Sequence, residues 1–452
     1  MNISKKELVP AVKAFLDIHY DASKPILLGF SGGPDSLALL HAILEYKKQH
    51  PIDLHLAHID HGWRPESAQE AELLQVMANR IGLPFHLIRI PAERLKGNLE
   101  AVCREERLNF FNSLSLKYHF QAVLLAHHSD DQSETVLKGI LEGKSLPYLA
   151  GMQPIISING LKLWRPLLGI NKKCIMDWLK SQGLKPLEDY TNLDPRFLRG
   201  RFRTQIIPAL AVDFGKEISE TLCHIGSEAL ELRTYLDDRI SIYIEALQVG
   251  TMGIALDLSQ FHSIPSIEMK YLLRKICERA GFHLNKEIID VILQHLEANS
   301  ADKQIIIGKQ KIFIDRKRLF FPKREIPTLE GIQLLREGMQ ACGPWQILVQ
   351  SSNKSLEMKQ ISWENAWNGK FEISIPRGEY SIGKASLQGN YQGRNLGKWW
   401  TNEKIPAFLR YAIPVLWKEN IITHEFLTGK AFHKKSLAEE YLNLSFTLVT
   451  IK

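Results

Sequence analysis

The chain has 452 residues, which is too long for one hydrophobic core and predicts two or three domains. Its 45% hydrophobic and 24% charged residues are typical of a soluble globular protein, and no apolar run is long enough to span a bilayer. The net charge of +7 suits a polyanionic partner. The five cysteines are scattered without a Cys-x-x-Cys pair, which argues against a zinc ribbon, an iron–sulfur site or a disulfide scaffold and favours the cytoplasm.

The N-terminal half alternates strand-like and helix-like segments. Residues 1–16 predict an amphipathic helix and not a signal peptide. We then predict four strands rich in valine, isoleucine and leucine, at residues 26–30, 54–59, 85–90 and 122–126. Helices are predicted at residues 37–49, 66–81, 99–116 and 133–142. This alternation predicts parallel β-α-β units and therefore an α/β domain with a doubly wound, Rossmann-like parallel sheet covered on both faces.

The rest of the chain has a different pattern. Residues 214–319 read mainly as helix, for example at 218–247 and 267–280, with a hairpin at 305–307 and 312–314. A proline-flanked linker is predicted at 323–327, followed by strands at 347–350, 371–375 and 446–450 and a helix at 399–409. The predicted domains are therefore the α/β domain over residues 1–213, a helical domain over 214–322 and a smaller α+β C-terminal domain over 328–452.

A glycine-rich loop follows the first predicted strand and precedes the next helix. It consists of Ser31, Gly32, Gly33, Pro34, Asp35 and Ser36. The glycines let the backbone approach an anion closely, and the N–H groups that open the helix point toward it. The loop lacks the G-x-x-x-x-G-K-[ST] pattern, so it does not hold phosphates through a lysine of that motif. The strand–loop–helix context favours nucleotide binding over an ordinary turn capped by Ser36.

Polar motifs also follow the second and fourth predicted strands. After the second strand, Asp60, His61 and Arg64 are candidates to contact the ribose or phosphates of a nucleotide, and His127 and His128 follow the fourth. Ligands of such sheets bind beyond the carboxyl ends of the strands, so we expect the three motifs to converge on one crevice. The histidine spacing matches no known zinc pattern, and we expect hydrogen-bonding histidines instead.

Acidic and basic side chains share helical faces further along. Asp131 and Glu134 lie three residues apart at the start of a predicted helix, so their carboxylates share one face. Charge at a helix N-terminus explains one of them, but with Asp130 they repel one another unless Mg²⁺ or an ammonium group lies among them. Arg104 and Arg107 share a face of the preceding helix, where solvent exposure explains either alone. Together with the carboxylates, Arg107 completes a receptor for a zwitterion.

An arginine-rich tail closes the predicted α/β domain. Acidic and amide side chains at 188–194 are followed by Arg199, Arg201 and Arg203 around Phe202. Alternate arginines around an aromatic ring can clamp phosphates and stack on a base, although a solvated basic loop is the usual fate of such runs.

Taken in order, these motifs resemble those of the tRNA(Ile)-lysidine synthases, a family of PP-loop ATP pyrophosphatases. The A-H-H-S-D-D-Q-S-E-T segment at 126–135, with the arginine tail, is far more specific than the glycine-rich loop alone. The resemblance covers about the first 205 residues, and 404–416 is similar to the extra C-terminal domain of the family's long form. Gly200 departs from the family, which has asparagine there, and removes one side-chain amide.

The resemblance implies a ligase that joins L-lysine to the wobble cytidine (position 34) of a CAU-anticodon isoleucine tRNA. ATP would adenylate the C2 oxygen of that base and release pyrophosphate, and the ε-amine of lysine would then attack C2 and displace AMP. The loop would hold pyrophosphate, with Asp35 beside Mg²⁺ or the α-phosphate. Asp131 and Glu134 would grip the ammonium groups of lysine and Arg107 its carboxylate.

The same resemblance implies the remaining roles. Arg201 and Arg203 would contact phosphate near the reacting base. Residues that would contribute to ATP binding, besides the loop, are Asp60, His61, His127 and Arg165. The domains at 214–322 and 328–452 would contact the rest of the tRNA, with Trp399 and Trp400 either on that surface or buried. The sequence leaves open which carboxylate takes the amine proton, whether ornithine or arginine is accepted, and whether the chain is a homodimer.

Other PP-loop enzymes are the nearest alternatives. A tRNA thiolase needs a suitable pair of sulfur-carrying cysteines, and an NAD or GMP synthetase needs an ammonia source and has no use for the arginine tail. A nucleotide-sensing RNA-binding protein with a dead site is the alternative from another class. The intact Asp35, Asp131 and Glu134 argue against it.

Overall fold

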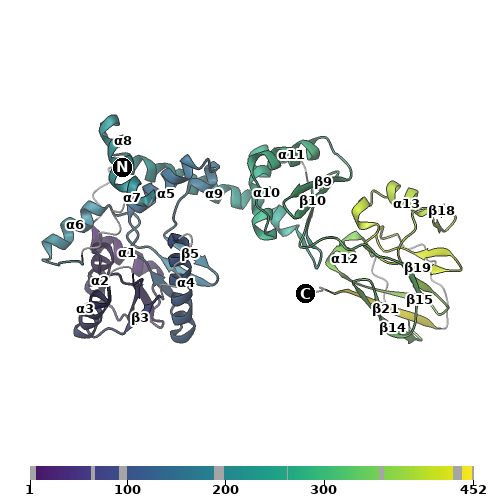
Figure 1. Cartoon of the computed structure of the whole chain (residues 1–452), viewed down its shortest axis with the longest axis horizontal. Coiled ribbons are helices and arrows are strands. Elements are labelled where there is room, and N and C mark those ends of the chain that lie inside the picture. Colours follow the sequence, from purple (N-terminus) through teal and green to yellow (C-terminus); the bar gives the residue numbers. More distant parts are fainter. Residues whose placement is uncertain are drawn as a thin grey trace. The chain divides into compact units, whose positions relative to one another are not determined.

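The computed structural model describes residues 7–62, 67–90, 99–187, 198–261, 263–354, 356, 361–430 and 440–449 (Figure 1). The chain forms two compact units, Met1–Tyr235 and Leu236–Lys452, and the boundary falls within helix α9 (Ile218–Glu245). The three domain ranges expected from the sequence stay predictions. Within the described residues, no helix has the length and apolar character to cross a membrane.

A six-stranded sheet in the order β3-β2-β1-β4-β6-β5 forms the centre of the described part of the first unit. Its strands are β1 (Ile26–Gly29), β2 (Leu54–Asp60), β3 (Phe85–Arg89), β4 (Ala122–Leu124), β5 (Ile155–Ile158) and β6 (Leu161–Trp164). The first five strands of that order are parallel, and β5 pairs antiparallel with β6. The predicted parallel α/β sheet is therefore confirmed. The β5–β6 hairpin was missed, although Asn159-Gly160 at its turn, both with positive φ, is a strong hairpin signal.

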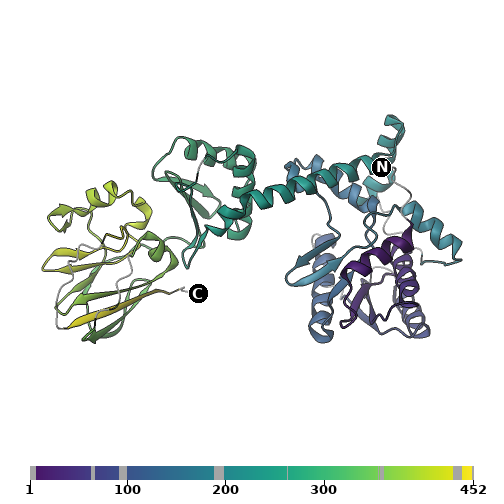
Figure 2. The same ribbon diagram turned by 180° about the vertical axis from the view of Figure 1, so that it is seen from behind.

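Helices cover both faces of this sheet because alternate residues of each strand point to opposite sides. Ile26 and Leu28 of β1 pack in one core cluster with α1, α2, α3 and α6, whereas Leu27 packs in another with α4. Figure 2 shows α1, in purple, in front of the sheet. The helices of this unit, besides α9 and the short η2 (Leu146–Leu149), are α1 (Leu8–His19), α2 (Pro34–Lys47), α3 (Ser67–Arg80), α4 (Leu99–Tyr118), α5 (Ser129–Leu141), α6 (Lys172–Ser181), α7 (Leu198–Arg201), the π-helical η4 (Phe202–Ile206) and α8 (Ile207–Phe214).

The second unit begins with the region that we predicted to be mainly helical. It contains α10 (Ser266–Ala280) and α11 (Lys286–Glu297), but also an antiparallel sheet in the order β7-β8-β11-β10-β9. Its strands are β7 (Gln248–Val249), β8 (Gly253–Asp257), β9 (Lys303–Ile307), β10 (Gln310–Asp315) and β11 (Arg318–Pro322). The predicted hairpin is β9–β10. The other strands were missed because β8 and β11 are short buried runs without the polar alternation of a half-exposed strand.

The remainder of the second unit is a mixed α+β structure. One sheet has the order β12-β16-β19-β20-β17-β18 and another the order β13-β14-β21-β15. The elements are β12 (Ile332–Leu334), β13 (Gly338–Cys342), β14 (Trp345–Ser352), α12 (Trp363–Asn368), β15 (Lys370–Pro376), β16 (Ser381–Gly383), β17 (Asn390–Tyr391), β18 (Arg394–Asn395), α13 (Leu396–Asn402), η5 (Ala407–Leu409), β19 (Val415–Lys418), β20 (Ile421–His424) and β21 (Tyr441–Leu448). Residues 323–331 form neither helix nor strand, as the predicted linker requires.

The long helix predicted over 399–409 is wrong. Helix α13 ends at Asn402, Lys404 takes a positive φ of 57°, and a separate short helix follows at η5. Pro406 explains the break, because it has no N–H to donate and restricts the residue before it. Trp399 and Trp400 are 7% and 0% exposed, so they are core residues and do not form an open stacking surface.

Candidate active site

The glycine-rich loop connects β1 directly to α2. The helix begins at Pro34 with Gly33 as its N-cap and no side-chain cap, so the interpretation of Ser36 as N-cap is wrong. Gly32 has φ +77°, and a Cβ there would lie 2.7 Å from Leu74 Cδ2. The buried Ser36 hydroxyl donates to the Gly33 carbonyl at 3.1 Å. These contacts hold the loop at the N-terminus of α2, and a helix N-terminus is a favourable place for an anion.

Lys172, the first residue of α6, contacts both this loop and α5, and no sequence motif pointed to it. Its Nζ lies 2.5 Å from Asp35 Oδ1, and its backbone N–H donates to Asp130 Oδ1 at 3.2 Å. The Lys172 and Asp35 side chains are 33% and 29% exposed, so a ligand can reach this ion pair. The lysine stands at the first position of α6, directly after the N-cap Asn171. A lysine therefore contacts the loop, but it comes from a helix and lies 137 residues from Asp35 in sequence.

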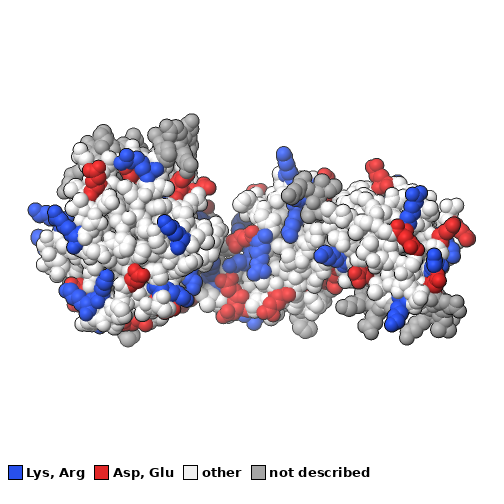
Figure 3. Space-filling model, turned by 90° about the horizontal axis from the view of Figure 1, so that it is seen from below, with Lys and Arg blue, Asp and Glu red and all other residues white. Residues whose placement is uncertain are grey.

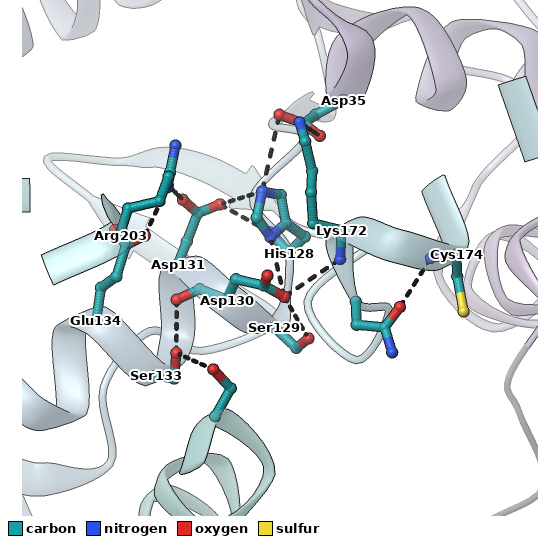
Figure 4. Close-up of polar contacts among 12 residues, drawn as sticks. Asp35, His128, Ser129, Asp130, Asp131, Ser133, Glu134, Lys172, Cys174 and Arg203 are labelled. Atoms are coloured by element: carbon teal, nitrogen blue, oxygen red, sulfur yellow. Dashed lines mark hydrogen bonds and ion pairs between the residues drawn. The ribbon is translucent and has the colours of Figure 1, made fainter. Parts of the chain in front are cut away.

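His128 lies among three carboxylates at the N-terminus of α5 (Figure 4). Its Nε2 is 3.7 Å from Asp35 Oδ2 and 3.5 Å from Asp131 Oδ2, and its Nδ1 is 3.7 Å from Asp130 Oδ1. Burial favours the neutral ring, but the three carboxylates outweigh it and raise the pKa of His128. Its backbone N–H donates to Asp131 Oδ2 at 3.0 Å. His128 therefore connects the glycine-rich loop electrostatically to the acidic start of α5, which we call the acidic helix.

Arg203 supplies the cation that the acidic helix requires. Its Nε donates to Glu134 Oε1 at 2.8 Å and its Nη2 to Asp131 Oδ1 at 2.9 Å. Burial raises the pKa of Glu134, and the Arg203 guanidinium opposes that shift. The two carboxylates do share one face, as predicted, and Arg203 lies between them where Mg²⁺ or an ammonium group was expected.

Arg199 is close enough for its charge to act on His127 and Glu134, whereas Phe202 and Arg201 point elsewhere. Phe202 is 2% exposed and packs with Val136 and Leu137, so the ring between the arginines is part of the hydrophobic core. Arg201 is exposed and lies two residues from Arg203 in a helical stretch, on a different side. Predicted residues outside the described structure are Arg64 and the acidic and amide side chains at 188–194.

His127 and Arg165 form a second, less acidic wall of the site. Arg165, 6% exposed, donates from Nε to His127 Nδ1 at 3.2 Å and from Nη1 to the Gln153 carbonyl at 2.6 Å. Burial is the main cause that lowers the pKa of His127 to about 4; Asp131 opposes this shift, and the charges of Arg165 and Arg107 contribute to it. His127 is therefore a neutral acceptor, and Arg107 is close enough to act on both groups.

Asp60 lies buried at the end of β2, where neighbouring donors hold its carboxylate. Its carboxylate is 2% exposed and accepts from the Gly62 N–H at 2.8 Å and from Arg89 Nε at 2.7 Å. The neighbouring His58 Nδ1 lies 2.9 Å from the Phe30 carbonyl, which fits a packing role. His61 is partly buried at the same strand end.

The site therefore places the glycine-rich loop and Lys172 near a carboxylate pair that already binds the guanidinium of Arg203. Strands β1 and β4 are neighbours whose connections leave in opposite directions, and ligands bind at such a switch point. The loop after β1 and Lys172 suit phosphates, whereas Asp131 and Glu134 suit a cation. Within the described residues, no three His, Cys, Asp or Glu side chains form a metal-binding cluster.

This fold and this loop define an ATP-binding α/β domain of the PP-loop class, and a family model described as a PP-loop domain matches residues 5–210. The chain is 36% identical over 449 residues to the tRNA(Ile)-lysidine synthase of Protochlamydia amoebophila (strain UWE25). The aligned residues cover 99% of this chain and 98% of the relative. It belongs to the tRNA(Ile)-lysidine synthase family.

Two further similarities accompany this one. The tRNA(Ile)-lysidine synthase of Chlamydia caviae is 32% identical over 306 residues, which cover 65% of this chain and 94% of that relative. Among solved structures, the U34-tRNA thiolase NcsA from Methanococcus maripaludis matches with a TM-score of 0.41 and 19% identity, over 50% of this chain and 78% of that one.

Proposed function

We propose that this chain uses ATP to join L-lysine to C2 of the wobble cytidine (position 34) of CAU-anticodon tRNA(Ile), forming lysidine. ATP adenylates the C2 oxygen and releases pyrophosphate; the lysine ε-amine then bonds to C2 and the C2–O bond to AMP breaks. The observation that carries the proposal is the chain of contacts from Asp35 in the glycine-rich loop, through His128, to Asp131 and the Arg203-bridged Glu134. It connects a nucleotide cradle to a receptor for an amine.

The nucleotide half uses the backbone amides of Ser31–Ser36 for pyrophosphate. Lys172 and Asp35 present a positive and a negative group at the mouth of the loop, which suits a phosphate–metal ligand. Mg²⁺ is usually bound through one or two carboxylates together with phosphate oxygens, so the partly exposed Asp35 fits it. The ion would shield charge as the α–β bond breaks. Neutral His127 and Arg165 are the further contacts on this side.

The lysine half uses the acidic helix. Asp131 and Glu134 are assigned to the ammonium groups and Arg107 to the carboxylate. Since Arg203 already bridges the two acids, incoming lysine must share their oxygens with it or displace it. The ε-ammonium has to lose a proton before it attacks. Glu134, whose pKa burial raises, is the better proton acceptor of the pair, because Asp131 has a lowered pKa.

The tRNA contacts follow from charge and accessibility. Exposed Arg201 is assigned to a phosphate near the reacting base, which can leave the single-stranded anticodon loop at little cost. The second unit would contact other parts of the tRNA. On the face drawn in Figure 3, basic and acidic side chains are interspersed, which favours individual phosphate contacts over one broad basic field. The five cysteines are free, which supports a location in the reducing cytoplasm.

Transfer of labelled lysine to an unmodified CAU-anticodon tRNA(Ile) transcript tests the proposal. The mixture contains ATP and Mg²⁺, and the control transcript carries uridine at the wobble position. Label on the first transcript alone, lost in Asp35→Ala and kept in Asp177→Ala on the exposed side of α6, supports lysidine formation. Pyrophosphate release without label contradicts lysine as the nucleophile, and neither product contradicts the whole proposal. Sedimentation of the same preparation decides between a monomer and a homodimer.

A further inference from the structure

A buried carboxylate holds an exposed guanidinium at the outer edge of the first unit's sheet. The Asp60 side chain is 1% exposed, whereas that of Arg89 is 60% exposed, and Arg89 Nε donates to Asp60 Oδ2 at 2.7 Å. The other oxygen, Oδ1, accepts from the Gly62 N–H at 2.8 Å. Arginine has five N–H donors, so the Nε contact, the side-chain hydrogen bond of Arg89 within the described residues, uses one of them and the two terminal nitrogens carry four more.

This arrangement fixes the direction of the arginine. An exposed ion pair contributes little to stability, and burying a carboxylate is unfavourable in itself. Asp60 offsets that burial with the Gly62, Ser67 and Arg89 contacts, which together lower its pKa against the effect of burial. The lowered pKa favours the charged form of Asp60, which holds Arg89 by its inner nitrogen. The free end of the guanidinium is preorganised to bind an anion, because part of its rotamer freedom is already lost.

The position of Arg89 separates it from the nucleotide crevice. Asp60 and Arg89 are register partners at the carboxyl ends of the parallel strands β2 and β3, the same edge of the sheet at which the glycine-rich loop follows β1. Strand β3 is at the end of the sheet, two strands from β1, or about 10 Å at the usual strand spacing. The β1–β4 switch point, where a nucleotide binds, lies on the other side of β1. Arg89 is therefore placed for a larger anion that extends past this edge.

We propose that Arg89, held by Asp60, binds a backbone phosphate of the substrate tRNA. The inference rests on the proposed function, since it takes the tRNA from there. A planar guanidinium can engage two phosphate oxygens at once, and such contacts position a nucleic acid without reading its sequence. Asp60 is then a positioning residue that acts through Arg89, which revises the expectation that its carboxylate contacts ribose.

Direct binding of the unmodified tRNA transcript to the full chain, measured at several salt concentrations, tests this. Arg89→Gln is compared with Arg80→Gln, an exposed arginine in the last turn of α3. We expect Arg89→Gln to weaken binding severalfold and to reduce the slope of log affinity against log salt by about 1, as loss of one phosphate contact does. Arg80→Gln should change neither, and Arg89→Lys should recover most of the salt slope but not the full affinity.

Steady-state kinetics separates the alternatives. The KM for ATP should be unchanged in Arg89→Gln. A raised ATP KM with unchanged transcript binding would assign the phosphate to ATP and overturn the inference. An unchanged salt slope together with a lowered Tm would make the pair purely structural, and would also overturn it. Because transcript binding needs no turnover, failure of lysine transfer by the unvaried chain would contradict the proposed function without being confused with either result.

Discussion

The guanidinium of Arg203 bridges Glu134 and Asp131, with its Nε 2.8 Å from Glu134 Oε1. Glu134 is 3% exposed, so removing Arg203 leaves a buried carboxylate without its cation. We expect Arg203→Gln to lower the free energy of unfolding by about 1–3 kcal/mol, measured by urea denaturation. The exposed Arg201→Gln should stay within about 0.5 kcal/mol.

The Arg203–Glu134 pair also predicts non-additivity. The double variant Arg203→Gln/Glu134→Gln removes the cation and the charge that it neutralises, so it should recover part of the stability lost in Arg203→Gln. Additive losses in this double-mutant cycle would contradict a direct coupling between the two side chains.

Lys172 provides a further prediction, because its ammonium group contacts the carboxylate of Asp35. If it neutralises phosphate during adenylation, Lys172→Gln should reduce pyrophosphate release by about 10–100-fold, the effect of losing one contact to a charged group. Its neighbour Lys173 is exposed, and Lys173→Gln is the matched control. Equal rates in the two variants would show that the Asp35 contact serves only to hold α6.

Whether a feature of this site could be predicted depends on how far apart in sequence the contacting residues lie. The glycine-rich loop and the shared face of Asp131 and Glu134 are local features, fixed by a strand–helix junction and by the helical period. Arg203 and Lys172 reach their partners across 69 and 137 residues, and no local period reports such contacts. The arginine tail was therefore recognised as basic, but its carboxylate partners were not.

The same distinction holds for the fold. The parallel strands β1 to β4 follow from long apolar runs separated by helices. In the second unit, β8 and β11 are five residues each and buried throughout or nearly so, so their sequences resemble any short apolar segment. Asp60 shows a third limit, because its chemistry suggested a ligand while its burial and its contact with Arg89 could not be read from the sequence.

His128 predicts a dependence of stability on pH. The carboxylates of Asp35, Asp130 and Asp131 face its ring, and its pKa in the folded chain is raised above 6.5. The folded state then binds the proton more tightly than the unfolded state. The stabilisation is fully present below pH 6.5 and is lost as the pH rises through the folded pKa.

Comparison with His128→Asn isolates this effect. The difference in free energy of unfolding between the unvaried chain and the variant should be largest near pH 6 and shrink as the pH is raised toward 9, measured by urea denaturation. A difference that is constant over this range would mean that the ring acts by packing and not by charge.

Gly32 and Gly33 are adjacent but have different conformational requirements. Gly32 has φ +77°, and an added Cβ would lie 2.7 Å from Leu74 Cδ2 and 2.8 Å from Leu187 Cδ1. Gly33 has φ −68°, and its Cβ would meet Ser31 Oγ at 3.4 Å, an ordinary contact. We expect Gly32→Ala to lower the free energy of unfolding by about 1–3 kcal/mol and to raise the KM for ATP at least tenfold, because the strained loop can no longer close around phosphate. Gly33→Ala should keep the stability of the unvaried chain, so any effect on the KM for ATP would come from the methyl group facing the ligand. If both variants lose the same stability, the shape of the loop is not set by the left-handed conformation of Gly32.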